Sequence, residues 1–312
     1  MAVQPCFRFE IRYYYDNDRC GRKTSYSGLL LTGDCSRPNL TFQGISMFGF
    51  RKRRRQKLRL KALKPEWETV LKKNVRFYNY LTADMQKQLH GLIQIFIAEK
   101  NFEGCSGLEL TDEIRVTIAG QACILLLGRE TDIYPTLRTI LVYPHAYFAP
   151  VRQRMADGSI IEGIQPRLGE SWLRGQVVLA WDEILEDTND IHDGHNLVFH
   201  EFAHQLDNES GAAEGAPEFS QRSRYTVWAR VLTREYNKLI SDIINNRQSL
   251  LDKYGATNPA EFFAVVTEFF FEKPVQLKKL HPELYEQFRI YYTLDPAKLM
   301  HSDKAPVSGI SE

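Results

Sequence analysis

Apolar residues recur with the period of an amphipathic helix over much of the chain after residue 65. In two consecutive segments they lie three and four residues apart, which gives a helix one buried face. The first segment begins at residues 65–67, and the second follows a capping sequence at residues 82–84. The period returns at about residues 223–245. We therefore expect three helices that each bury one side.

Segments with a different pattern lie between these helices. Apolar and polar residues alternate at 114–118, which is typical of a strand, and the apolar block at 119–127 predicts a buried helix. Residues 137–143 and 171–181 are rich in strand-forming residues, and Asp-Gly at 157–158 is typical of a hairpin tip. Strands mixed with helices without regular alternation predict an α+β fold.

The most informative apolar pattern surrounds three polar residues in the segment NLVFHEFAHQLD, residues 196–207. His200, Glu201 and His204 form the motif H-E-x-x-H on a predicted helix. Residues four apart lie on one helical face, roughly 5–6 Å apart at Cβ, so the two imidazoles can bind one Zn²⁺. Glu201 points about 100° round the helix, where it can accept a proton from a water on the metal. The alternative is an ordinary amphipathic helix with surface histidines, but the apolar flanks predict burial and buried imidazoles need partners.

The ends of this helix also have signals in the sequence. Asp190, Asp193 and Asn196 are candidate N-terminal caps, and Gly211 is a candidate stop. Gly175, in the strand just upstream, indicates a place where another backbone segment approaches closely.

A catalytic zinc site needs a third protein ligand, and two glutamates are candidates. Asp207 and Ser210 exclude the metzincin continuation of the motif. A later helix, which begins near the predicted cap Asn258, carries Glu261 and Glu268 on one stripe. Buried carboxylates are costly unless they are paired or bound to metal. From the residues alone, Glu261 is either a ligand or part of a capping box, and Glu268 is either a ligand or a partner of a basic residue or ligand imidazole.

The remaining acidic and imidazole side chains give weaker signals. Asp207 lies on the face of His204, where it either orients a ligand histidine or serves as a cap or salt-bridge partner. The histidines outside the motif have no ligand spacing and are expected at the surface. They are His90, His145, His192, His195, His281 and His301.

Composition and charge add one local feature. The 312 residues are 43% hydrophobic and 25% charged, which is typical of a globular chain. The net charge of +1 conceals eight basic residues within 51–61, so the rest of the chain is acidic and no global nucleic-acid surface is expected. The basic segment is interpreted as a solvated arm, with contact to acidic lipid or nucleic acid as the alternative.

Cysteine usage and hydropathy indicate a cytoplasmic protein. The five cysteines include no C-x-x-C pair and are interpreted as free thiols. No apolar run reaches the roughly 18 residues of a membrane span, and the N-terminus lacks the pattern of a signal peptide. We expect a dispensable extension at 1–46, a basic arm at 47–64, one domain at 65–300 and a flexible tail at 301–312.

Four segments resemble one known family. The sequences HEFAHQLD, YGATNPAEFFAVVTEFFF, SWLRGQVVLAW and MFGFRKRRR are similar to those of the Mlc titration factor A zinc peptidases, and the resemblance covers about residues 47–300. It implies a zincin-like α+β fold, similar to the catalytic domain of anthrax lethal factor, with a small mixed sheet packed against the active-site helix. It also implies that Zn²⁺ is held by His200, His204 and Glu261, and that Tyr254 stabilises the transition state.

The predicted function is therefore a zinc-dependent, aminopeptidase-like peptidase with Glu201 as general base. The strand at 175–180 is expected to pair with the backbone of a peptide or protein substrate. The resemblance further implies binding of an Mlc-like repressor of sugar uptake, and no direct contact with nucleic acid is expected. The alternative is a non-catalytic regulatory protein whose zinc site is structural or vestigial.

Overall fold

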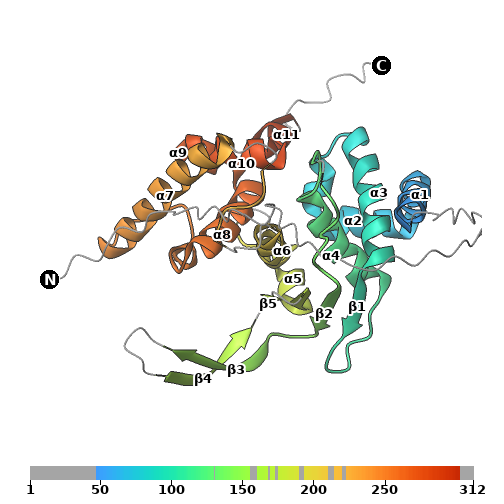
Figure 1. Cartoon of the computed structure of the whole chain (residues 1–312), viewed down its shortest axis with the longest axis horizontal. Coiled ribbons are helices and arrows are strands. Elements are labelled where there is room, and N and C mark those ends of the chain that lie inside the picture. The colour runs from blue at the N-terminus through green and yellow to red at the C-terminus, as the bar shows by residue number, and fades with distance from the viewer. Residues whose placement is uncertain are drawn as a thin grey trace, which may run out of the picture.

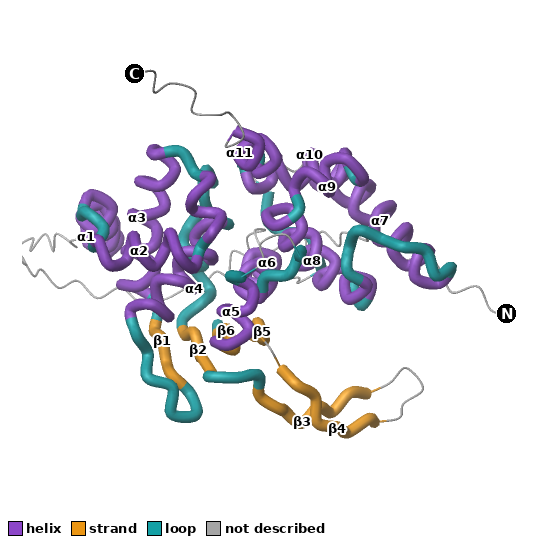
Figure 2. Tube along the Cα trace, turned by 180° about the vertical axis from the view of Figure 1, so that it is seen from behind, coloured by secondary structure: helices purple, strands orange, loops and turns teal. Residues whose placement is uncertain are grey.

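The computed structural model of the chain describes residues 47–302, apart from 130, 155–159, 168, 173–174, 190–192, 210–213 and 220–222. The helices and strands follow one another in an irregular order, and Figures 1 and 2 show them from opposite sides. The α-helices are α1 Met47–Leu60, α2 Pro65–Asn74, α3 Ala83–Glu99, α4 Asp112–Ile124, α5 Trp181–Asp187, α6 Leu197–Asn208, α7 Ser223–Ile244, α8 Pro259–Glu272, α9 Pro274–Leu280, α10 Pro282–Tyr292 and α11 Pro296–Ser302. The 3-10 helices are η1 Arg76–Tyr80 and η2 Lys253–Ala256. The strands are β1 Asn101–Gly104, β2 Thr139–Tyr143, β3 Tyr147–Arg154, β4 Ile160–Arg167, β5 Gly169–Trp172 and β6 Gln176–Ala180.

The predicted mixture of strands and helices is confirmed. Strands β1, β2 and β6 are parallel neighbours, and β5 pairs antiparallel with β6 at the edge of this sheet. Strands β3 and β4 form a separate antiparallel hairpin that projects away from the helices (Figure 1). The strand predicted at 137–143 is β2, whereas the predicted hairpin tip at 157–158 lies outside the described residues.

The segment predicted as one strand at 171–181 is wrong in detail, because it contains two strands. β5 ends at Trp172 and β6 begins at Gln176, with Gly175 just before β6 at a φ of +79°. A Cβ on Gly175 would lie 2.5 Å from the carbonyl oxygen of Thr136, so the predicted close approach of backbone is confirmed. β6 has a strand on each side, and the prediction that it pairs with a substrate backbone is therefore wrong.

The strand predicted at 114–118 is also wrong, because these residues are part of α4. The Thr111 hydroxyl caps this helix by accepting a hydrogen bond from the backbone N–H of Ile114. Every residue of α4 from Val116 onwards is buried. Thr117 is among these buried residues, and its hydroxyl is satisfied by a hydrogen bond that it accepts from the side chain of Asn74. A helix covered on all sides has no polar face, so the alternation was misleading.

The basic segment is a helix rather than a free arm. Helix α1 packs against α3 (Figure 1), and most of its side chains are exposed. The Arg55 guanidinium binds Glu99 through two hydrogen bonds of 2.6 and 2.7 Å, and it also binds Asp132. Such a bidentate ion pair is stronger than an exposed single contact. The exposed side chains of α1 therefore agree with the prediction of a solvated arm. Arg55 does not, because it is bound to Glu99 and Asp132.

Helix α6 lies at the centre, between α4 on one side and α8 on the other (Figures 1 and 2). Phe202 of α6 contacts the rings of Phe96 and Tyr134 on the first side. Phe199 of α6 contacts Phe271 of α8 on the second side. Burial of apolar surface on both sides fixes the rotation of α6 about its axis. The described part of the chain thus holds its H-E-x-x-H segment on a rigid central element.

Two smaller predictions concern cysteines and membrane spans. Cys105 and Cys123, the cysteines that the structure describes, are both free, as expected. Within the described residues, no helix combines the length and apolar character that a bilayer crossing requires.

The helices predicted at residues 65, 82 and 223 are confirmed as α2, α3 and α7.

Candidate metal centre

Three acceptors hold the N-terminus of α6. The Asn196 side chain accepts a hydrogen bond from the Phe199 N–H at 2.9 Å, which confirms Asn196 as the cap. Glu268 accepts from the backbone N–H of Asn196 at 2.8 Å, and Asp187 accepts from that of Leu197 at 2.7 Å. These bonds satisfy N–H groups that have no partner inside the helix. The start of the motif helix is therefore fixed, while the predicted stop at Gly211 lies outside the described residues.

Helix α8 delivers the candidate third ligand. The Asn258 side chain caps α8 by accepting from the Glu261 N–H at 2.9 Å, and Pro259 is the first helical residue. From Phe262 to Glu272 the helix is buried on all sides. Glu261 therefore lies in the first turn, where the helix emerges beside α6. Its backbone is part of a cap, but its carboxylate turns toward the two imidazoles.

The structure brings together His200, His204 and Glu261, whose candidate ligand atoms lie within 4.8 Å of one another. The Nε2 atoms of the two histidines are 3.3 Å apart, and the Oε2 atom of Glu261 is 3.0 Å from His200 Nε2 and 3.3 Å from His204 Nε2. Tetrahedral ligands about 2.0–2.1 Å from one ion lie about 3.3 Å apart. Two imidazole nitrogens and one carboxylate oxygen at this spacing fit Zn²⁺.

The imidazole of His200 is oriented by a second carboxylate. Glu268, which is buried, places Oε1 2.7 Å from His200 Nδ1. When Nδ1 carries the proton and donates to Glu268, the Nε2 lone pair faces the cluster, which is the arrangement that a metal requires. The same carboxylate binds the start of α6 through its other oxygen. Of the alternatives for Glu268, the contact to a candidate ligand imidazole is the one observed.

The charges in the cluster favour the binding of a cation. Burial opposes ionisation of Glu261, but hydrogen bonds from His200 and His204 outweigh it and lower the carboxyl pKa to about 2. Burial also opposes protonation of His200, but Glu268 and Glu261 outweigh it and raise the imidazole pKa well above its usual value. The Glu261 carboxylate is therefore charged although it is partly buried. It is stabilised by a positive charge beside it, from a proton on an imidazole or from a metal ion.

Glu201 and Tyr254 lie beside the cluster rather than in it. Glu201 is buried and follows His200 in α6, so its carboxylate leaves the helix in a different direction. Tyr254 belongs to η2, and its ring centroid is 6.0 Å from that of His200. About half of the tyrosine side chain is exposed. An acid and a phenol from separate elements thus flank the three candidate ligands.

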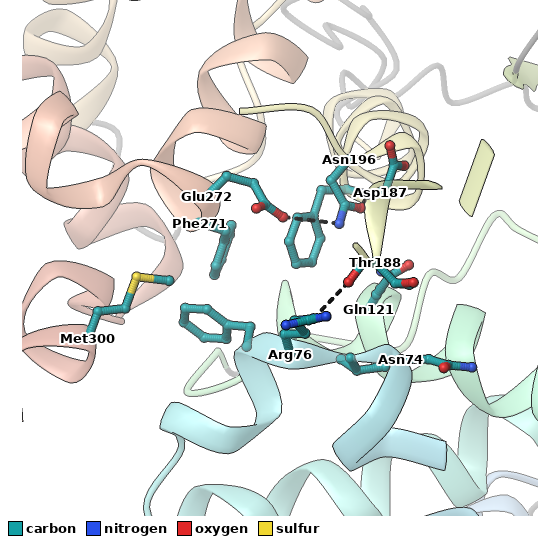
Figure 3. Close-up of a pocket in the computed structure, with 12 residues that line it drawn as sticks. Asn74, Arg76, Gln121, Asp187, Thr188, Asn196, Phe271, Glu272 and Met300 are labelled. Carbon is teal, nitrogen blue, oxygen red and sulfur yellow. Dashed lines mark hydrogen bonds between the residues drawn. The ribbon is translucent and has the colours of Figure 1, made fainter. Parts of the chain in front are cut away.

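Sequence reasoning missed a supporting layer beneath α6 (Figure 3). The Asn196 amide donates to Glu272 at 3.2 Å, and Asp187 binds His195 Nδ1 at 2.7 Å. This hydrogen bond to Asp187 raises the pKa of His195 to about 9, and the imidazole is exposed, so the expected surface position of His195 is confirmed. A cavity of about 10 Å³ lies beside Asn196 and Glu272, which is room for about one water molecule. The signal in the sequence was two carboxylates, Asp187 and Glu272, on apolar helical segments.

Three other polar residues have structural partners away from the cluster. Asp207 is buried and accepts a hydrogen bond from the Gly215 N–H at 2.8 Å, so it fastens the segment after α6. His281 was expected at the surface but is buried against Glu235 at 2.7 Å, and His90 is half-buried against the Tyr78 hydroxyl. Both surface predictions are wrong. The partner of His281 is distant in sequence, and the partner of His90 lies across the turn that precedes its helix.

Comparison with known proteins adds an independent finding. The sequence profile of a family described as glucose-regulated metallo-peptidase M90 matches residues 50–293. An uncharacterized protein of Synechocystis sp. is 46% identical over 246 residues, which cover 78% of this chain and 89% of that protein. Proteins named Mlc titration factor A are 31% identical in Pectobacterium atrosepticum, over 71% of this chain and 84% of that protein, and 29% identical in Escherichia coli, over 75% and 88%. The matched region contains the three clustered side chains.

Proposed function

Because the chain belongs to the glucose-regulated metallo-peptidase family M90, together with the Mlc titration factor A proteins, we propose that it is a zinc-dependent peptidase. The observation that carries the proposal is the convergence of His200, His204 and Glu261 from two helices on one point. The donor set of two imidazoles and one carboxylate leaves a coordination position for water or substrate. This is the ligand set of a zincin-like site.

Zn²⁺ held there would lower the pKa of a water molecule and polarise the carbonyl of a bound peptide. Glu201 would accept the proton of the attacking water and pass it to the leaving amine. Its burial and its position directly after His200 in α6 support this role. Glu268 holds His200 in the productive orientation.

Tyr254 would donate a hydrogen bond to the oxyanion that develops on the substrate. Its ring lies near His200, and its exposure allows a bound peptide to reach the hydroxyl. A donor that meets charge only as it develops stabilises the transition state more than the substrate. The Asp252 side chain accepts from the Tyr254 N–H at 2.7 Å and thereby fixes the start of η2.

The edge strand β5 is the best placed element for a peptide substrate. It borders the sheet on the side that packs against α6. An extended peptide could add to this edge by main-chain hydrogen bonds. β6, the strand predicted for this role, is not available because it pairs with β2 and β5. A short, unblocked peptide, as an aminopeptidase uses, needs only one such edge.

A second candidate function is binding of a transcriptional repressor in the cytoplasm. It is supported by the name Mlc titration factor A, which several relatives carry. In that case the zinc site would be structural or vestigial. The presence of both Glu201 and Tyr254 beside the cluster favours the catalytic function, because a structural zinc site needs neither.

Metal content and peptidase activity, measured together, test the proposal. We expect wild-type protein to bind one equivalent of zinc and to cleave an unblocked alanyl chromogenic amide, with activity lost on chelation and restored by zinc. Glu261→Ala should lose zinc binding and activity, whereas Glu235→Ala, a change at a buried glutamate outside the cluster, should keep bound zinc. A folded wild-type protein that binds no zinc, or activity that survives chelation, would overturn the proposal.

A further inference from the structure

We propose that the chain has a second ligand site, for a small molecule that carries a carboxylate or phosphate group together with a hydrogen-bond donor. The site is a cavity of about 700 Å³. It lies between residues 128–129 and 131–136, the C-terminal end of α6 and helix α10, with the start of α7 at its border. Ligand pockets in proteins commonly have volumes of about 300–1,000 Å³.

Two arginines line this cavity without a carboxylate partner. Arg129 and Arg224 form no ion pair with any residue that the structure describes. Arg129 is the more enclosed of the two, and its Nη1 atom is buried without a hydrogen-bond partner. A buried guanidinium that the described residues leave without a carboxylate partner is costly, and a bound anion would offset that cost.

The Arg129 guanidinium is held in a fixed orientation. It lies over the ring of Tyr291, with its central carbon 4.2 Å from the ring centroid. Stacking on an aromatic face fixes the plane of the guanidinium and leaves the edges of that plane to donate. The guanidinium fork matches carboxylate and phosphate oxygens in geometry. The class of ligand follows from this fork.

Glu209 provides the complementary half of the site. It lines the same cavity, and its Oε1 atom is buried without a hydrogen-bond partner. No ion pair joins Glu209 to Arg129, although both border the cavity, so a ligand can lie between them. Asp132 is a further acid on the border, but it binds Arg55 and Ile133. A hydroxyl or ammonium group on the ligand would therefore donate to Glu209.

Calorimetric titration of the zinc-loaded full chain tests this site. The probes are 3-phosphoglycerate, succinate and inorganic phosphate, each at the same ionic strength set with sodium chloride. We expect saturable binding of 3-phosphoglycerate with a Kd of about 1 mM or below. Succinate and inorganic phosphate distinguish the two oxyanion types and lack the alcohol hydroxyl of 3-phosphoglycerate, so they should bind more weakly. The titration is repeated after chelation, because oxyanions also bind zinc, and binding at this cavity should persist.

Variants locate the binding. Arg129→Gln should weaken binding by about tenfold or more, because one charge-assisted hydrogen bond contributes about 1.5–3 kcal/mol. If the Arg129→Gln protein does not fold, Arg129→Lys is tested instead. Lysine keeps the positive charge but lacks the guanidinium fork, so this variant should also bind the probe more weakly. Arg289→Gln is the matched control, because Arg289 lies on α10 but pairs with Glu286 outside the cavity. Absence of binding by the wild type, or binding that both Arg129 variants retain, would overturn the proposal. Neither outcome affects the peptidase proposal.

Discussion

The two ends of helix α6 differ in how their buried polar groups are satisfied. At the N-terminal end, Asn196, Glu268 and Asp187 form hydrogen bonds within the chain. Beyond the C-terminal end, Arg129 and Glu209 border a large cavity, and each has a buried polar atom without a partner. Polar groups that already have hydrogen-bond partners hold other residues in place. Polar groups without a partner beside a cavity are available to a ligand.

The candidate metal centre lies between these ends and combines both properties. His200 is held by Glu268 on one nitrogen and presents the other to His204 and Glu261. One ring nitrogen of His200 thus fixes the orientation of the imidazole, and the other is left to bind an ion. Substitution of a residue that meets the reacting atoms should therefore reduce turnover, whereas substitution of a positioning residue should weaken zinc binding.

Glu201→Gln should produce the largest loss of turnover. Glutamine keeps the shape of the side chain but cannot accept the proton, so kcat should fall about 10²–10⁴-fold while zinc content stays at one equivalent. Steady-state kinetics with metal analysis measures both quantities. Glu209→Gln, just beyond the C-terminal end of the same helix, is the control and should keep its turnover. Full activity in the Glu201 variant would remove it as the general base.

Tyr254→Phe should have the next largest effect on turnover. Loss of one donor to a developing oxyanion costs about 10²–10³ in kcat, with little change in KM or zinc content. Tyr236→Phe tests whether the effect comes only from movement of η2, because the Tyr236 hydroxyl donates to the Ala256 carbonyl at the end of η2. Equal losses in the two variants would make Tyr254 a structural residue.

Glu268→Gln should lower zinc affinity about 10–100-fold, because the residue orients a ligand without touching the ion. Glutamine has one acceptor oxygen where glutamate has two, so it cannot accept from both His200 and the Asn196 N–H, and one of these bonds is lost. Competition with a zinc-selective chelator measures the affinity. Glu235→Gln breaks a comparable buried bond to His281 and should leave zinc affinity unchanged. A normal zinc affinity in Glu268→Gln would contradict the orienting role.

Glu209→Gln should have the smallest effect, and that effect should depend on pH. Burial raises the carboxyl pKa of Glu209 from 4.5 to about 7, so the folded state binds more protons than the unfolded state between these values. The contribution of Glu209 to the free energy of unfolding therefore falls as pH rises through this window. The variant should gain stability relative to wild type from pH 4.5 to 7, measured by urea denaturation. A difference that does not change with pH would contradict the burial of this acid.

Local signals in the sequence were sufficient to predict much of the candidate site. The motif residues, the Asn196 cap and the Asn258 cap all depend on spacing within one helix or its first turn. Chemistry within a few residues fixes such features, and distant packing does not change them. Which of Glu261 and Glu268 meets both imidazoles was not fixed locally, and the residues alone left it open.

Contacts between distant segments account for what the sequence did not predict. The hydroxyl of Thr117, which is buried in α4, is satisfied because Asn74, 43 residues earlier, donates to it. His281 is buried against Glu235, 46 residues earlier. Arg55 binds Asp132, 77 residues later. Periodicity and propensity contain no information on which distant residues will meet, so these pairs were invisible before the fold was known.

An anomalous difference map from crystals of the zinc-loaded protein, recorded on both sides of the zinc absorption edge, tests the central claim most directly. The account predicts one strong peak within bonding distance of His200 Nε2, His204 Nε2 and a carboxylate oxygen of Glu261. A map without a peak there, or with zinc bound by other side chains, would contradict it.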